Sequence, residues 1–218
     1  MRHVSWFQLR ENPTMVGEVN EARACLLVMP GSPALVRELA PADEPSQRLL
    51  NSIRETAGKL TKTIDIVCSH DRRWATHLAG SFAAWGAPHV EVGGGHVLGE
   101  LVARYCLHGA TVRESREHLL PLDPSVLTVL VVDGPAGLTT RAPLALIPAA
   151  ADTNDKLQAL LSGKQSSLIR EQEMRDAGVL EPDIWLELQT LQPTKATLVD
   201  VDDTLGVGRY VAYWEVEQ

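Results

Sequence analysis

Two short, almost wholly apolar runs constrain the fold of this chain more than any other feature. Residues 64–68 read IDIVC and residues 126–134 read VLTVLVVDG. Runs of this length that are rich in β-branched residues are typical of strands buried on both faces, as in a parallel sheet between helices. A third run, ARACLLVM at 22–29, has the same character and ends at Pro30. The three runs predict an α/β protein.

Helical periodicity fills most of the segments between these runs. The helices predicted from it cover 45–60, 72–85, 97–107, 152–162, 165–177 and 181–191. A short strand is expected at 89–92, and two more at 196–201 and 208–216, with Gly206 and Gly208 in the turn between them. This order predicts a single domain with a central mixed, largely parallel sheet, helices on both faces and an antiparallel terminal pair.

Length and composition set the outer limits. The chain has 218 residues, 44% of them hydrophobic, which suits one core formed by residues 24–218. Residues 1–23 are interpreted as an N-terminal extension or an added edge strand. Apolar runs stay well short of the roughly 20 residues of a membrane-spanning helix, so no membrane partner is expected. The cysteines at 25, 68 and 106 are odd in number and dispersed, which indicates reduced thiols of a cytoplasmic protein.

Charge argues against nucleic acid as a partner. The formal net charge is −8, and the basic residues are scattered rather than clustered, whereas phosphate binding needs a basic face. The pairs Arg72-Arg73 and Arg113 with Arg116 are interpreted as solvated helix faces. The sequence leaves open a homodimer formed through an exposed sheet edge or through the Trp-bearing ends.

Polar residues at the end of the IDIVC run are the first candidates for chemistry. Ser69, His70 and Asp71 follow this strand, at the position where α/β folds build their sites. His70 is either a metal ligand or base, or a structural loop residue. The seven histidines show no H-x-H or H-E-x-x-H spacing, so spacing alone leaves both interpretations open.

Two other motifs have alternative interpretations. The glycines at 93–95 could cradle a phosphate at a helix start, but we favour a tight turn because the G-x-G-x-x-G pattern fails. The stretch VDVDDTL at 199–205 resembles the D-x-D-x-T motif of haloacid-dehalogenase-type phosphatases. In that resemblance Asp200 is the nucleophile, Asp202 is a general acid/base and Mg²⁺ offsets their charge. The favoured alternative is an acidic turn before the last strand.

Four segments share a further likeness: LLVMPGSPALV at 26–36, DIVCSHDRRW at 65–74, VLVVDGPAGLTTRAP at 129–143 and LGVGRYVAYWE at 205–215. Together they resemble the catalytic-subunit fold of class III (type II) extradiol ring-cleavage dioxygenases, and more narrowly a degenerate branch of actinobacterial type. The first resembles a strand with a P-H-x-P-like turn, and the second a strand that ends in Ser-His. The third resembles a strand before a G-x-G-x-L-S-H-like loop, and the last the closing strand of that fold.

Active members of that family hold Fe²⁺ with two histidines and one glutamate, and a further histidine acts as acid/base on a catechol-like substrate. A facial set of three ligands leaves positions open for substrate and O₂. By the resemblance, His70 matches the second metal histidine and Glu181 the carboxylate ligand. Gly31 stands at the first ligand position and Thr140 at the acid/base position. The resemblance therefore implies a metal centre that has lost most of its ligands.

On this basis we expect the cleft to bind a small molecule or a partner protein without ring cleavage and without a cofactor. A dioxygenase with a rearranged Fe or Zn site, and a phosphatase-like hydrolase that uses Asp200 and Asp202, are the alternatives. Asp133 and His70 are expected as polar anchors of the cleft, or as caps of their loops. The full set of expected cleft residues is Ser32, Ser69, His70, Asp71, His96, Asp133 and Thr140.

Overall fold

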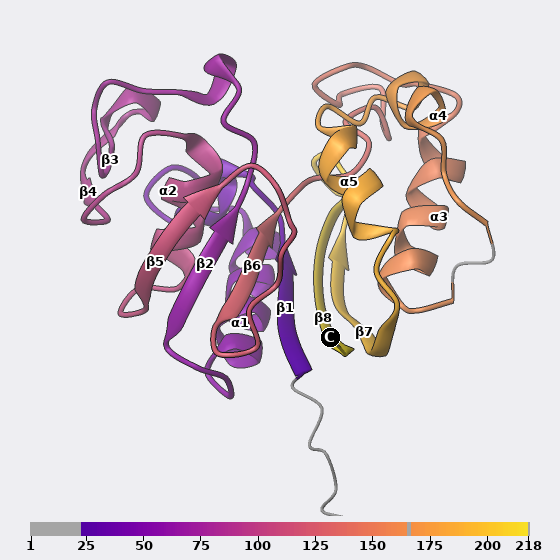
Figure 1. The fold of residues 1–218 in the computed structure, drawn as a ribbon. Helices are drawn as coiled ribbons and strands as arrows, with labels where there is room; N and C mark the ends of the chain where they lie inside the picture. Colours follow the sequence, from indigo (N-terminus) through magenta and orange to yellow (C-terminus); the bar gives the residue numbers. More distant parts are fainter. Residues whose placement is uncertain (1–22, 165–166, 218) are drawn as a thin grey trace, which may run out of the picture.

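The computed structural model describes residues 23–164 and 167–217, and a six-stranded sheet with the order β5-β2-β6-β1-β8-β7 forms its centre (Figure 1). Neighbours among β5, β2, β6 and β1 run parallel, whereas β8 runs antiparallel to both β1 and β7. The strands are β1 (Arg23–Met29), β2 (Thr63–Val67), β5 (Thr111–Arg116), β6 (Leu127–Val131), β7 (Pro193–Asp202) and β8 (Arg209–Glu217). The predicted α/β class with a mixed, largely parallel sheet is confirmed.

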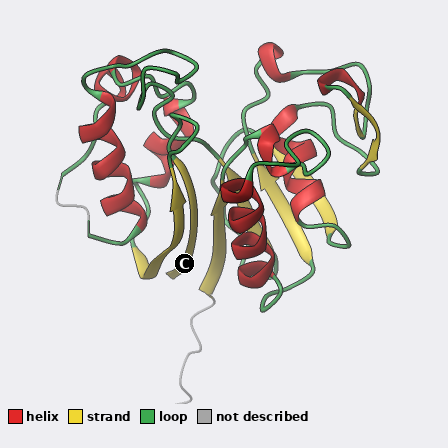
Figure 2. Ribbon diagram, turned by 180° about the vertical axis from the view of Figure 1, so that it is seen from behind, coloured by secondary structure: helices red, strands yellow, loops and turns green. Residues whose placement is uncertain are grey.

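Helices pack on both faces of this sheet (Figures 1 and 2). The helices are α1 (Glu44–Ala57), α2 (Leu98–Cys106), α3 (Ala150–Leu161), α4 (Glu171–Asp176) and α5 (Pro182–Leu188). In the described residues, no helix is both long enough and apolar enough to cross a bilayer. The interpretation of residues 1–23 lies outside the described part of the chain, except for Arg23, which begins β1.

Alternation along β1 shows why the central strands are apolar throughout. Leu27 and Met29 pack into a core cluster with α1 and α2, whereas Leu26 and Val28 pack into a second cluster with α3 and α5. Successive side chains of a strand point to opposite faces, and here both faces are covered. A polar residue at any of these four fully buried positions would lose its hydration on either side.

The helix predicted at 72–85 is wrong. Within this range Arg72–Trp74 and Ala83–Trp85 form short 3₁₀ turns, and Ser81–Phe82 is strand β3, which pairs with β4 (Ala87–Glu91) just beyond it. Residues 75–80 form a loop. Gly80, with a φ of 67° in the left-handed region, interrupts any helix over 72–85, and Gly86, with a φ of 97°, ends the second 3₁₀ turn. A Cβ atom on Gly80 would also lie 2.7 Å from the Gly94 nitrogen.

The interpretation of Arg113 and Arg116 as a helix face is also wrong, because both lie in β5. This edge strand carries one apolar residue, Val112, and the other strand residues are polar, so its pattern gives no strand signal. The Arg113 guanidinium donates to both carboxylate oxygens of Asp65 on the neighbouring strand β2, and the Asp65 side chain is fully buried. This charge-assisted contact with β2, rather than an apolar pattern of its own, links β5 to the sheet.

The glycine turns behave as the spacing predicts. Gly93 and Gly95 have φ values of 77° and 99°, and Gly206, in the turn between β7 and β8, has a φ value of 76°. These values favour the tight-turn interpretation of 93–95. In the described parts of the ranges predicted as helices, 167–177 and 181–191, only Glu171–Asp176 and Pro182–Leu188 are helical.

Candidate functional site

A cavity of about 410 Å³ lies at the edge of the sheet where β1, β2 and β6 end. Its walls come from the loops that follow these three strands, at residues 31–34, 68–69 and 132–136. The start of α2, residues 180–181 before α5, and the β7–β8 loop complete it. Carboxyl ends of neighbouring parallel strands meet at one edge of a sheet, which is where ligand sites of open α/β folds lie. Most of the lining residues are apolar.

Asp133, two residues after β6, is the main polar group of the cavity wall. Its Oδ2 accepts a hydrogen bond from the Gly31 N–H at 3.2 Å. Its Oδ1 is buried and has no hydrogen-bond partner among the described residues. Burial raises the pKa of Asp133 from 3.8 to about 6. The residue is only partly buried as a whole, so one carboxylate oxygen is desolvated while other atoms of the residue face the cavity.

Neighbouring elements fix Asp133 in this position. The indole Nε1–H of Trp185, in α5, donates to the Asp133 backbone carbonyl at 2.9 Å. Gly31 approaches from the end of β1, and a Cβ atom on it would lie 3.3 Å from both Asp133 Oδ2 and Val131 Cγ1. The position that the resemblance assigns to a first metal ligand is thus filled by a backbone N–H that binds a carboxylate.

Glu181 also lines the cavity, and its side chain contacts Trp74, another lining residue. Its Oε1 accepts from the Trp74 indole N–H at 2.8 Å and from the Arg73 guanidinium at 3.2 Å. These bonds link the loop after β2 to the segment before α5. Arg73 additionally forms an ion pair with Asp71 at 3.0 Å. Glu181 therefore uses one carboxylate oxygen to hold two walls of the cavity together.

His70 does not belong to the cavity-lining residues. Its Nε2 lies 3.4 Å from the Ser115 hydroxyl, and its backbone N–H donates to Glu117 at 3.3 Å. Asp71 accepts from the Arg73 N–H at 2.8 Å and so caps the short turn at Arg72–Trp74. Hydrogen bonds from Arg73 hold the pKa of Asp71 below its ordinary value. Both residues thus make contacts typical of a loop after a strand.

The other expected cleft residues divide into two groups. Ser32 and Ser69 line the cavity, and each hydroxyl accepts a backbone N–H, from Ala34 at 3.3 Å and from Asp71 at 3.2 Å. His96 and Thr140 are exposed and lie outside the lining.

The described residues do not fit the iron site that the resemblance implies. Ligands such as His, Cys, Asp and Glu gather in no group of three or more that could hold a metal ion within 23–164 and 167–217. His70 contacts β5, while Glu181 is bound by Trp74 and Arg73.

Cys68 lines the cavity but is not a candidate nucleophile. It is fully buried at the end of β2, and burial raises the pKa of its thiol to about 12. The reactive form of cysteine is the thiolate, which is almost absent at neutral pH for such a group. Cys25 and Cys106 are likewise free thiols, as expected from the dispersed spacing.

Sequence reasoning missed the residues that close the cavity. Trp74, Leu205 and Val207 all line it, yet none was a candidate. Trp74 follows Ser69-His70-Asp71 by three residues, so an aromatic side chain just after a polar strand end was the available signal. Val207 lies in the β7–β8 loop, which reaches the site through two backbone hydrogen bonds between Gly208 and residues 134–135.

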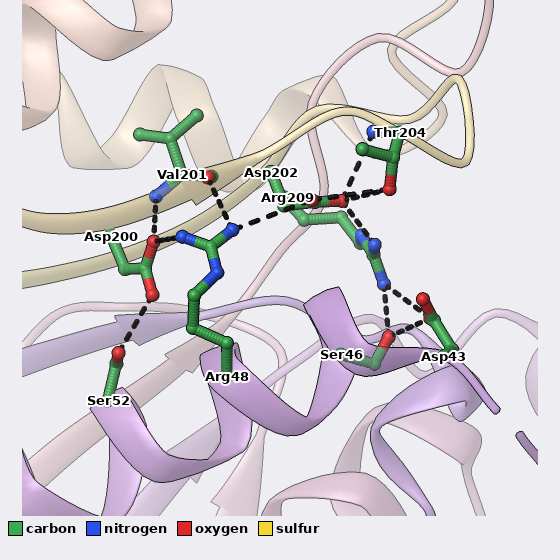
Figure 3. A network of polar contacts seen from close by, with 9 residues as sticks. All are labelled: Asp43, Ser46, Arg48, Ser52, Asp200, Val201, Asp202, Thr204 and Arg209. Carbon is green, nitrogen blue, oxygen red and sulfur yellow. Dashed lines mark hydrogen bonds and ion pairs between the residues drawn. The ribbon is translucent and has the colours of Figure 1, made fainter. Parts of the chain in front are cut away.

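The acidic stretch at 199–205 forms an ion-pair network with α1 and β8 (Figure 3). Asp200 accepts from Arg48 and from the Ser52 hydroxyl, the latter at 2.8 Å. Asp202 is buried and accepts from Arg209, which is itself fully buried. Neither carboxylate lines the cavity, and both bind guanidinium groups within the protein. The arrangement resembles an interlock between helix and sheet rather than a nucleophile beside its acid.

Comparison with known proteins adds no further assignment, because no family model and no curated protein matches the chain.

Proposed function

We propose that this protein binds a small, largely apolar molecule that carries a hydrogen-bond donor, in the cavity at the ends of β1, β2 and β6. The observation that carries the proposal is the Asp133 carboxyl group in a largely apolar cavity wall, whose Oδ2 accepts from Gly31 and whose buried Oδ1 has no hydrogen-bond partner among the described residues. A buried polar atom left unpaired costs roughly 1–3 kcal/mol, and a ligand donor that reaches this carboxylate would offset part of that cost.

The size and lining of the cavity support a small molecule rather than a macromolecule. Ligand pockets commonly measure about 300–1,000 Å³ and combine apolar walls with a few polar groups that orient the ligand. A volume of about 410 Å³ lies near the lower end of this range. The polar groups here are few and come from Ser32, Ser69, Asp133 and Glu181.

Binding is a better-supported proposal than ring cleavage or phosphate hydrolysis. The residues assigned to an iron centre do not converge, and Asp200 and Asp202 are held by Arg48 and Arg209 away from the cavity.

A cavity-filling variant tests the proposal. Thermal-shift screening of small aromatic and aliphatic molecules would identify ligands, and calorimetry would give their dissociation constants. Val207→Trp places a large side chain in the cavity, whereas Val199→Trp makes the same change on β7, at a residue that is 43% exposed and outside the lining. We expect Val207→Trp to weaken binding by at least about tenfold and Val199→Trp to leave it unchanged. Ligands that bind Val207→Trp as tightly as the unmodified protein would contradict the proposal.

A further inference from the structure

Two carboxylates and no basic side chain line the cavity. Asp133 and Glu181 contribute to its wall, and none of the lining residues is Lys, Arg or His. Charge of one sign in an apolar enclosure favours a ligand of the opposite sign, because fields are screened less there than in bulk water. We infer that the ligand of this cavity is a protonated amine joined to a compact apolar group. This inference rests on the proposed binding function and names its ligand class.

The basic side chains near the cavity neutralise Glu181 more than they neutralise Asp133. Arg73 already lies 3.2 Å from Glu181 and offsets its charge. Arg209 is the basic group whose field reaches Asp133, but its guanidinium is bound to Asp202 and lies 3.5 Å from Asp43. Asp133 is therefore the carboxylate that stands without a direct cationic partner.

An anionic ligand would find few donors at the same place. Backbone N–H groups at strand ends often bind phosphate or carboxylate groups. Here three of them are already used by the protein itself. They are the N–H groups of Gly31, Gly134 and Ala136, which donate to the Asp133 carboxylate and to the carbonyls of Gly208 and Gly178.

The protonation of Asp133 makes the inference testable by pH. The titratable groups that face it are Arg209 and Tyr210 from β8, Cys68 from the end of β2, and Glu181 before α5. Burial raises the pKa of both Tyr210 and Cys68, so that both stay neutral as the pH passes 6. Since the pKa of Asp133 itself is raised to about 6, an amine should bind fully above this pH and about tenfold more weakly at about pH 5.

Three matched probes separate the possibilities: 2-phenylethylamine, the neutral 2-phenylethanol and the anionic phenylacetate. Their dissociation constants would be measured by calorimetry or by ligand-observed NMR at about pH 5 and about pH 7.5. At the higher pH we expect the amine to bind at least about tenfold more tightly than the alcohol, and the anion to bind most weakly. The preference for the amine should fall at the lower pH, in the unmodified protein and without any substitution.

Asp133→Asn should abolish the preference for the amine while the alcohol still binds. Asp183→Asn is the control, because it removes the same charge from a side chain that is 80% exposed and outside the lining. An alcohol that binds as tightly as the amine, or an anion that binds best, would overturn the inference and leave the proposed function standing. Failure of all three probes to bind at millimolar concentration would contradict both.

Discussion

Replacing Asp133 by asparagine should show, in the pH dependence of the free energy of unfolding, how much the ionised Asp133 carboxylate destabilises the folded protein. Burial raises the pKa of Asp133 from 3.8 to about 6, so the folded protein holds a proton that the unfolded chain releases. Each pKa unit corresponds to about 1.4 kcal/mol, which gives a penalty of about 3 kcal/mol. The penalty is absent below about pH 4, grows as pH rises towards 6, and is complete above it.

Asparagine cannot ionise, so Asp133→Asn removes the pH-dependent part of the penalty. Its carbonyl can still accept from Gly31, while its amide would occupy the unpaired position at a constant cost of about 1–3 kcal/mol. The difference in unfolding free energy between the variant and the unmodified protein should therefore shift by about 3 kcal/mol in favour of the variant as the pH rises from about 4 to about 8.

Urea unfolding followed by circular dichroism at several pH values measures this difference directly. Asp183→Asn, whose side chain is 80% exposed, should show no comparable change. A difference between Asp133→Asn and the unmodified protein that stays constant from about pH 4 to about pH 8 would refute the reasoning, because Asp133 would then titrate alike when folded and unfolded.

Two further predictions concern the core and the thiols. Arg209→Met should destabilise the protein by about 3–5 kcal/mol in urea unfolding, because it removes the fully buried guanidinium that pairs with the buried Asp202 carboxylate. The matched change Arg175→Met should cost less than about 1 kcal/mol, since that guanidinium is 47% exposed; similar costs for both would contradict the role of the network. In the folded protein, Ellman's reagent should label Cys25 and spare the buried Cys68 and Cys106, and full labelling before unfolding would contradict their burial.

The local sequence pattern was enough to predict the strands that are buried on both faces of the sheet. β1 and β6 are buried on both faces, and their continuous apolar runs say so within a few residues. β5 lies at the sheet edge and is placed by the pairing of Arg113 with Asp65, 48 residues earlier in the chain. No window short enough to carry periodicity contains that contact. Residues 72–85 are not one helix because Gly80 adopts a left-handed φ, and this conformation is set by the close approach of Gly94, a contact that the local sequence does not reveal.

The sequence predicted the parts of the candidate site that lie at strand ends, but not those that depend on contacts between distant segments. Asp133 and Ser69 follow central strands, and a strand end is a local feature that topology turns into a site wall. His70 shares that position, but its ring lies beside Ser115 on β5, which depends on a strand the sequence did not reveal. Val207 reaches the cavity because Gly208 exchanges backbone hydrogen bonds with residues 134–135, a contact between distant segments.

The carboxyl titration of Asp133, followed by carbon NMR with and without 2-phenylethylamine, tests the central claim most directly. Comparison with Asp133→Asn would assign the signal. One aspartate should titrate at about 6 in the free protein, and the bound amine should lower its pKa, because a cation stabilises the ionised form. An Asp133 that titrates at its ordinary value, or whose pKa the bound amine leaves unchanged, would contradict the account.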